Sequence, residues 1–244
     1  MFSAALVMAL LSANAQKRAF TIEDLYKVKG VSSVRLSPDG KTVCYTASSS
    51  DLKNQKSGSD IYIMNADGSH AKALTEDGKS SSAVWSKDGK SIFFTNYEKG
   101  TAQIFRMDLT TCETEQVTDY ELGISSPVIS PDERYIAFTA EVYPDLGADA
   151  KANKARMEKK EQGPVQAHIA DKLLYRHWTS YNDGRCNHLI LFDTQTKTYK
   201  DLTPGNYSLI FVVGGGITYQ FSPDSKEICF VSNHDEHQEA STNA

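Results

Sequence analysis

The sequence predicts an all-β fold, a partial β-propeller of about three and a half four-stranded blades with a short N-terminal helix and a partly helical insertion in blade three. One observation is a repeat, in which a turn that begins with serine precedes an apolar strand at 37–46, 86–95, 130–139 and 222–231. Another is its spacing, because the four serines are 49, 44 and 92 residues apart and the last step is about two earlier ones. Strand-rich repeats of this length are typical of propeller blades.

Each turn has a local role that its residues explain. In Ser37-Pro38-Asp39-Gly40, proline presets φ, aspartate bonds its own backbone and glycine accepts a positive φ. The run therefore indicates a tight turn between two strands. Because an aspartate recurs in each turn, Asp39 and Asp132 are interpreted as parts of a hairpin rather than as catalytic carboxylates.

The N-terminal residues are expected to lie outside the fold. Residues 2–11 form an apolar run that is too short to span a bilayer, and Ala13-Asn14-Ala15 fits a signal-peptidase cleavage pattern. The sequence therefore predicts a secretory signal peptide at 1–15, cut before Gln16, although no Lys or Arg precedes the apolar run. A buried strand or helix is the alternative interpretation.

A helix and linker are predicted at 16–30. Thr21, with an acidic residue three positions later, resembles a capping box, and Leu25 and Val28 lie on one face of the helix. We expect this helix to pack on the first blade.

The incomplete propeller is predicted to occupy 31–244. Its blades are expected at 31–76, 82–119, 124–205 and 215–244, and the polar residues 48–59 of blade one are expected to form a loop. The fourth blade ends after two strands, and a propeller of three and a half blades leaves an open sheet edge. The chain is therefore expected to be a truncated part of a longer protein.

Blade three contains an insertion at 142–184. Its first half, 148–162, is rich in Ala, Lys and Glu and lacks an apolar stripe, which predicts a solvated helix. Its second half gathers Arg176, His177, Trp178 and Tyr181. Two interpretations stay open for this cluster: it packs the insertion onto blade three, or it borders a substrate path, where Arg grips a carboxylate or carbonyl and Trp forms a rigid apolar wall.

The four cysteines do not form a disulfide framework. Cys44 and Cys229 occupy the same position of the repeat, where the other copies have Phe and Ala, so both are expected to be buried free thiols. A bridge between Cys112 and Cys186 is left open.

Several chemistries have no support in the sequence. The net charge is −5 and no run of five or more Lys or Arg occurs, which argues against a nucleic-acid surface. No G-x-S-x-G, H-E-x-x-H, Walker or dinucleotide-binding glycine pattern occurs, so no catalytic residue, metal ligand or cofactor is assigned. His234 and His237 flank two acids that can bind a metal, but a solvated loop is favoured, and His70, His168 and His188 are interpreted as surface or structural residues.

Four features together resemble one known group. They are the opening segment Thr21–Leu25, the S-P-D-G turns, the string Arg176-His177-Trp178 before a late third strand, and Ser232-Asn233-His234-Asp235. The chain from about 19 to 244 resembles the N-terminal propeller of prolyl oligopeptidase family serine peptidases, in the dipeptidyl-peptidase 5 and acylaminoacyl-peptidase branch. In that family the propeller covers a C-terminal α/β-hydrolase domain with a Ser-Asp-His triad, filters substrates by size and helps to hold the N-terminal end of the peptide.

The resemblance implies exported peptide processing, in the periplasm or outside the cell, with short peptides as substrates of the complete enzyme and with no nucleic acid and no membrane span after signal removal. It makes Arg176, His177, Trp178 and Tyr181 candidate substrate-binding residues, although Thr179 and Tyr181 differ from the acid and second Trp expected after Arg-His-Trp. The triad has no counterpart here, so this chain is expected to be inactive by itself. The alternative is a non-catalytic, TolB-like periplasmic propeller that acts as a protein-interaction scaffold.

Overall fold

The computed structural model describes residues 18–165, 167–170, 176–177, 179–209 and 218–234. The predicted signal peptide at 1–15 lies outside these residues. Three four-stranded antiparallel sheets form most of the described chain, and we call them blades one, two and three. Blade one is β1 (Gly30–Leu36), β2 (Thr42–Asp51), β3 (Lys56–Asn65) and β4 (Lys72–Ala73); blade two is β5 (Ser80–Trp85), β6 (Ser91–Asn96), β7 (Gln103–Asp108) and β8 (Thr114–Gln116); blade three is β9 (Ser125–Ile129), β10 (Tyr135–Val142), β13 (Cys186–Asp193) and β14 (Thr198–Asp201).

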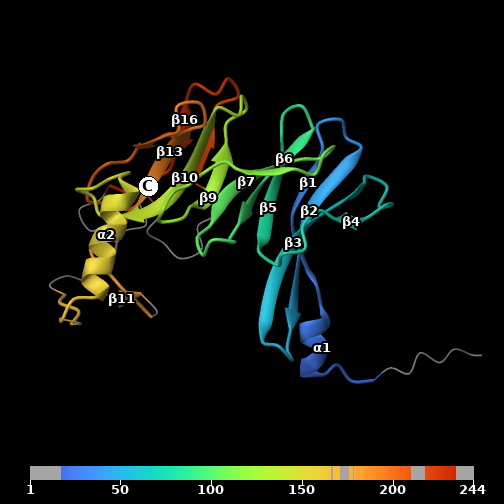
Figure 1. Cartoon of the computed structure of the whole chain (residues 1–244), viewed down its shortest axis with the longest axis horizontal. Coiled ribbons are helices and arrows are strands. Elements are labelled where there is room, and N and C mark those ends of the chain that lie inside the picture. The colour runs from blue at the N-terminus through green and yellow to red at the C-terminus, as the bar shows by residue number, and fades with distance from the viewer. Residues whose placement is uncertain (1–17, 166, 171–175, 178, 210–217, 235–244) are drawn as a thin grey trace, which may run out of the picture.

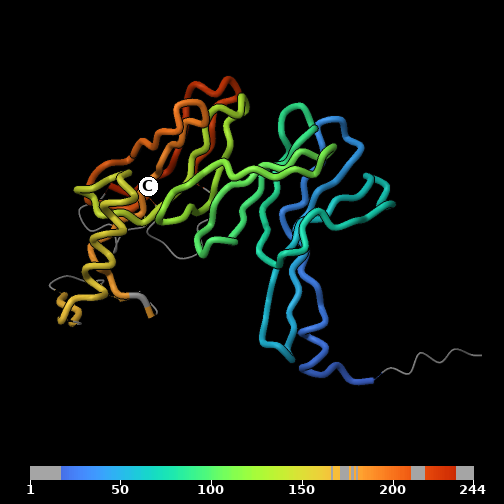
Figure 2. Tube along the Cα trace, viewed as in Figure 1, coloured from blue at the N-terminus to red at the C-terminus, as the bar shows by residue number. Residues whose placement is uncertain are grey.

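The remaining elements are short. A two-stranded sheet, which we call blade four, contains β15 (Tyr219–Phe221) and β16 (Ile228–Phe230). Helix α1 (Ile22–Lys27) precedes blade one, and α2 (Ala150–Glu161) with the hairpin β11 (Arg176–His177) and β12 (Ser180–Tyr181) lies between β10 and β13. The sheets follow one another side by side in chain order (Figures 1 and 2). The predicted all-β propeller fold, with its short N-terminal helix and its partly helical insertion, is confirmed.

The turns between the first two strands of each blade share one hydrogen-bond pattern. In blade one the Ser37 hydroxyl donates to the Asp39 carboxylate over 2.6 Å and accepts from the Thr42 backbone N–H over 2.9 Å. The bond from the Ser37 hydroxyl and one from the Lys41 backbone N–H lower the pKa of Asp39. The recurring aspartate is thus a part of the hairpin, as its repetition predicted.

The hydrophobic core lies between blades. Because side chains alternate across a strand, each sheet has a leading face toward the preceding blade and a trailing face toward the next one. Cys44 and Ile61 on the trailing face of blade one pack against Ile92 and Phe94 on the leading face of blade two. Equivalent clusters join blade two to blade three and blade three to blade four.

The polar segment 48–59 is not a loop, in contrast to the prediction. β2 and β3 are ten residues each and pair continuously from Thr42 with Asn65 to Asp51 with Lys56. The outer half of this hairpin is largely exposed on both faces, so its sequence lacks the apolar alternation that identifies a strand. Gly58 permits a close approach to the chain entering blade two, because a Cβ there would lie 2.8 Å from the carbonyl oxygen of Gly78.

Helix α1 has the predicted capping box, in which the Thr21 backbone N–H donates to the Asp24 carboxylate over 3.0 Å. Arg18 and Lys27 also bind this carboxylate, and together these bonds lower its pKa far below the usual range. The helix lies beside β2, but none of its residues is buried, and Leu25 is 60% exposed. The helix therefore lies against the first blade, as expected, but it buries no apolar side chain there.

The cysteine predictions are partly corrected. Cys44 is a buried free thiol, as predicted, and burial raises its pKa to about 11. Cys229 is exposed, because no described residue of a following blade covers it. Cys112 and Cys186 are both free, so the bridge between them does not form.

Candidate functional site

The insertion of blade three leaves the sheet after β10 and is held there by a buried amide. Asn153 in α2 is fully buried, and its side-chain oxygen accepts from the Tyr143 backbone N–H over 2.6 Å. Its side-chain nitrogen donates to the carbonyl oxygens of Gly147 and Asp149 over 3.0 and 2.8 Å. A helix with no apolar stripe is therefore anchored by hydrogen bonds rather than by an apolar face.

Cations from α2 cover the aromatic ring at the start of the insertion. The Arg156 guanidinium lies 4.7 Å and the Lys160 ammonium 5.3 Å from the centre of the Tyr143 ring. Arg156 also pairs with Asp145 over 2.7 Å, and Lys160 donates to the carbonyl oxygen of Asp183 over 2.8 Å. The two ends of the insertion are thus joined through one helix.

The chain returns to the sheet beside its point of exit. Val142 at the end of β10 pairs with Cys186 at the start of β13. Arg185 forms ion pairs with Glu141 over 3.1 Å and with Asp183 over 2.9 Å. The insertion is therefore a side structure on an uninterrupted blade. In Figure 1 it lies on the same side of the molecule as α1 and the free end of the β2–β3 hairpin.

Two of the four predicted site residues come together in the small hairpin. Arg176 on β11 pairs with Tyr181 on β12, and its guanidinium lies 5.6 Å from the centre of the Tyr181 ring. His177 belongs to β11 and pairs with Ser180. Trp178 lies outside the described residues.

His168 is a third member that the sequence analysis interpreted only as a surface or structural residue. Its ring stacks on Tyr181, with centroids 3.9 Å apart and planes 5° from parallel. No motif connects His168 with residues 176–181, because the intervening chain has no regular period. The hairpin cluster of His168, Arg176 and Tyr181 thus offers a cation beside flat aromatic surface, and Tyr181 is 40% exposed. Such a set can bind a carboxylate or carbonyl beside an apolar group.

A second polar arrangement recurs in every complete blade and was missed. Within each third strand, a backbone N–H donates over 2.9 Å to a threonine hydroxyl beyond the fourth strand, in the pairs Ile61 with Thr75, Ile104 with Thr118 and Leu189 with Thr203. The residue before each donor adds a side-chain bond to the chain that leaves the blade, and it differs each time: Asp60, Gln103 and His188. We call this arrangement the blade clamp.

The clamp of blade three contains the one fully buried histidine of the described chain. His188 Nδ1 lies 2.7 Å from the Asp201 carboxylate, and its Nε2 lies 2.9 Å from the carbonyl oxygen of Gly205. Burial is the largest single influence and opposes the charged form, but the hydrogen bonds to Asp201, Cys186 and Gly205 and the charge of Asp201 together outweigh it and raise the pKa of His188 to about 9. The interpretation of His188 as a structural residue is supported by these contacts.

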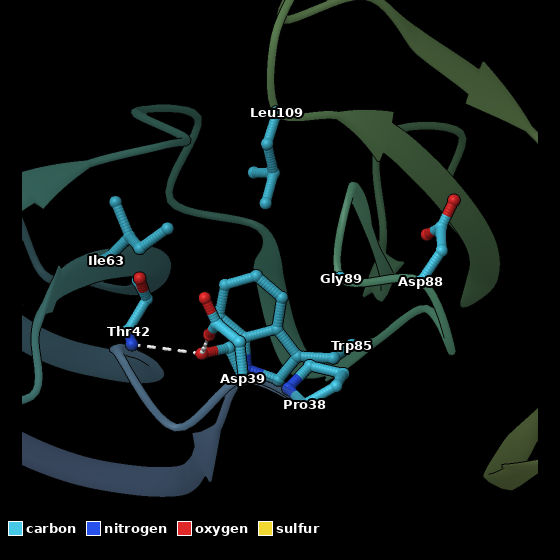
Figure 3. A pocket seen from close by; sticks show the side chains of 9 residues that line it. Pro38, Asp39, Thr42, Ile63, Trp85, Asp88, Gly89 and Leu109 are labelled. Carbon is cyan, nitrogen blue, oxygen red and sulfur yellow. Dashed lines mark hydrogen bonds between the residues drawn. The ribbon is translucent and has the colours of Figure 1, made fainter.

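A groove of about 410 Å³ lies between blades one and two, at the end where the hairpin turns are (Figure 3). Trp85, Ile63 and Leu109 form its apolar lining, with the carboxylates of Asp39 and Asp88 at its border. Both carboxylates bond to the serine of their own turn. Because both carboxylates are already bonded within their own turns, we assign no ligand to the groove.

The first strand of each complete blade has a β-bulge that the sequence analysis also missed. Ser33, Ser82 and Ser126 have φ values of 52°, 57° and 51°, in the left-handed region. Each lies four residues before the serine of the turn and follows another serine, so a Ser-Ser pair at fixed spacing was a usable signal.

No group of three or more His, Cys, Asp or Glu in the described part of the chain is arranged to hold a metal. Within the same residues, no helix has both the length and the hydropathy of a membrane span.

Comparison with known proteins agrees with the fold. The sequence profile of the TolB β-propeller domain matches residues 13–162. Dipeptidyl-peptidase 5 of Porphyromonas gingivalis is 31% identical over 207 residues, which are 83% of this chain and 29% of that protein. The uncharacterized peptidase YuxL of Bacillus subtilis is 26% identical over 228 residues, which are 92% of this chain and 33% of that one.

Among solved structures, the acylaminoacyl peptidase of Pyrococcus horikoshii superposes with a TM-score of 0.54 at 20% identity, over 74% of this chain and 26% of that one. This likeness shows the propeller fold. The chain spans 29%, 23% and 33% of the length of three curated relatives that it matches. The resemblance to dipeptidyl-peptidase 5 and acylaminoacyl peptidases is confirmed by these relatives.

Proposed function

The chain belongs to the TolB β-propeller domain family and is the propeller part of a peptidase-like protein, and from this premise we propose that it filters and orients short peptides for an exported serine peptidase of the prolyl oligopeptidase family. The hydrolase domain with its triad belongs to the rest of that enzyme. This chain by itself is expected to be inactive. Export follows from the signal peptide expected at 1–15 and places the protein in the periplasm or outside the cell.

The observation that carries the proposal is the insertion of blade three. A propeller blade needs only a short connection between its second and third strands, and blade two makes this connection between Asn96 and Gln103. Blade three uses the residues from 143 to 185 for the same step. Its hairpin cluster holds a guanidinium and two stacked rings at the surface, where a peptide carboxylate or carbonyl and an apolar side chain can bind together.

Peptide binding tests the proposal. Short peptides of two to eight residues with free carboxyl ends are titrated into the chain by calorimetry, and into the variants Arg176→Ala and Tyr181→Ala. Since hydrogen bonds to charged groups contribute about 1.5–3 kcal/mol, Arg176→Ala is expected to weaken binding about tenfold or more. Lys151→Ala removes an exposed cation from the same insertion and is the matched control. Equal affinities of Arg176→Ala and the unchanged chain would contradict the assigned role.

The alternative is a non-catalytic periplasmic scaffold of the TolB kind. The observation that favours it is a match to TolB of Francisella tularensis, 29% identical over 80 residues, together with the profile match. The two functions predict different DNA sequences downstream of codon 244. A reading frame that continues beyond codon 244 into G-x-S-x-G, Asp and His supports the peptidase, whereas a stop codon followed by an unrelated gene favours the scaffold.

A further inference from the structure

A thiol, an imidazole and a carboxylate meet where the insertion rejoins blade three. Cys186 is the first residue of β13 and pairs with Val142 at the end of β10. His188 lies two positions later, so its side chain leaves the strand on the same face as that of Cys186. Asp201 reaches His188 from the end of β14. We call Cys186, His188 and Asp201 the strand-start cluster, which is separate from the hairpin cluster of the insertion.

The imidazole of His188 is held in one orientation by contacts at both ring nitrogens. Nδ1 lies 2.7 Å from the Asp201 carboxylate, and Nε2 lies 2.9 Å from the carbonyl oxygen of Gly205. Both partners are acceptors, so only the doubly protonated ring can donate to the two of them. The side chain is fully buried and its pKa is about 9, so the ring carries a positive charge at neutral pH.

Cys186 is a nucleophile beside this fixed cation. Its thiol is free and is hydrogen-bonded to His188, and its Sγ lies 3.8 Å from Oδ1 of Asn206. Because both ring nitrogens of His188 are engaged, the imidazole is not available as a base for the thiol. It supplies a positive charge next to the sulfur instead. A neighbouring cation favours the thiolate, which is the reactive form of a cysteine.

Cys112 is a natural comparison within the same chain. It is also free, and it is exposed, whereas Cys186 is only partly exposed. Cys112 lies in the turn between β7 and β8, where the charged residues nearest to it in sequence are Glu113, Glu115 and Asp108. Negative neighbours disfavour a further negative charge. Exposure alone therefore predicts that Cys112 reacts faster, whereas local charge predicts that Cys186 reacts faster.

We propose that Cys186 is a site of reversible S-thiolation by small disulfides. The Cys186 thiolate attacks one sulfur of the small disulfide, a bond forms between Sγ and that sulfur, and the sulfur–sulfur bond of the reagent breaks. Cys186 is oxidised and the departing half is reduced to a thiol. That thiol takes up, through water, the proton that Cys186 lost. The proposal goes beyond peptide binding and does not depend on it.

The rate of mixed-disulfide formation tests the proposal in the unsubstituted chain. Hydroxyethyl disulfide, an uncharged reagent, is added in excess at neutral pH, and peptide mass spectrometry follows Cys112 and Cys186 separately. Cys186 is expected to gain the adduct about threefold faster or more, because the larger thiolate fraction is partly offset by lower nucleophilicity. A reducing agent is expected to remove the adduct. Equal rates, or faster reaction of Cys112, would overturn the proposal.

His188→Gln removes the positive charge and keeps a side chain that can form hydrogen bonds. Glutamine is the residue that blade two uses at the equivalent position of its clamp, Gln103. The substitution is expected to lower the rate at Cys186 to that of Cys112 or below, and to leave the rate at Cys112 unchanged. If Cys186 keeps its full rate in a folded His188→Gln variant, judged by circular dichroism, the cation is not the cause and the proposal is wrong.

Two further variants separate the cluster from the general surface charge. Asp201→Asn removes the carboxylate that holds the charge of His188, so it is expected to slow Cys186 in the same way. Lys200→Gln removes an exposed cation from the adjacent position of β14 and is the matched control, with no change expected. An equal slowing by Lys200→Gln would contradict the role of His188. If neither cluster variant folds, the comparison of Cys112 with Cys186 in the unsubstituted chain decides.

Discussion

Blades one and two are made by the same sequence unit, yet they place it in opposite environments. Val43 and Tyr45 follow the turn of blade one at the same distance as Ile92 and Phe94 follow that of blade two. Ile92 is 0% and Phe94 2% exposed, whereas Val43 and Tyr45 are only partly buried. The difference comes from the neighbouring sheet, because each leading face is covered by the blade before it.

A propeller repeat therefore specifies that its residues form a strand, but it does not specify how far that strand is buried. Local pattern sets the alternation of side chains, and the adjacent blade converts that alternation into a core. Equivalent substitutions in the two blades should therefore lower the free energy of unfolding by unequal amounts.

The largest inequality is expected for the aromatic residue on the second strand. Phe94→Ala should cost about 3–5 kcal/mol of unfolding free energy, because it leaves a cavity between blades one and two. Tyr45→Ala should cost about 1 kcal/mol or less, since its ring contacts mainly Tyr62 and solvent. Urea denaturation of both variants checks this. Equal losses would mean that another surface covers Tyr45 in solution.

A pH effect extends the comparison to blade three. The folded pKa of His188 is about 9, above its ordinary value of 6.5. The stabilisation of the fold by protonated His188 is therefore complete below about pH 6.5 and is lost as the pH rises through about 9. The loss is expected to be about 2–3 kcal/mol, measured by denaturation at pH 6 and pH 10. His188→Gln, which adopts the residue that blade two uses in its clamp, should remove this pH dependence. If the dependence is unchanged in His188→Gln, another group causes it.

Substitution of the clamp threonine should also lower the free energy of unfolding more in blade two than in blade one, but by a smaller difference. Thr118→Val should cost about 1–3 kcal/mol, because Thr118 is fully buried, the Ile104 N–H loses its threonine partner and Gln103 loses one of its hydrogen bonds. Thr75→Val should cost about 1 kcal/mol or less, since Thr75 is only partly buried and water can replace the bond. Thermal unfolding of the pair is sufficient, and a larger loss for Thr75→Val would contradict the burial argument.

The smallest expected inequality concerns the turn glycines. Gly40 and Gly89 have φ values of 73° and 70°, so each change to Ala should cost about 1 kcal/mol through backbone strain. A Cβ at Gly40 meets nothing within 4 Å, whereas one at Gly89 lies 3.4 Å from the Cδ of Pro38 in blade one. Gly89→Ala should therefore cost a few tenths of a kcal/mol more than Gly40→Ala. Differential scanning calorimetry would show whether the order is reversed.

The repeat, the turns and the core positions could be predicted because they depend on short-range pattern. Asp39 was placed correctly in its hairpin, and Cys44 was placed correctly in the core, from their recurrence alone. The β2–β3 extension was missed because its polar residues carry no apolar alternation.

The candidate site was predicted only in part. Arg176 and Tyr181 were found because they lie in one short stretch where aromatic, His and Arg residues gather, and the hairpin brings them together. His168 was not assigned to the cluster, because its contact with Tyr181 is made across a segment without a regular pattern. The clamps were missed because each joins residues 17 or 18 positions apart through a different side chain.

Turn chemistry and side-chain alternation act over a few residues, so the repeated strand unit, the positions of its turns and the family resemblance could all be predicted from the sequence. Which copies of that unit are buried depends instead on the packing of one sheet against another. Cys44 and Cys229 stand at the same position of the same repeat, and one is buried while the other is exposed. Burial is a property of the neighbouring sheet, and the identity of that neighbour is not written in the residue itself.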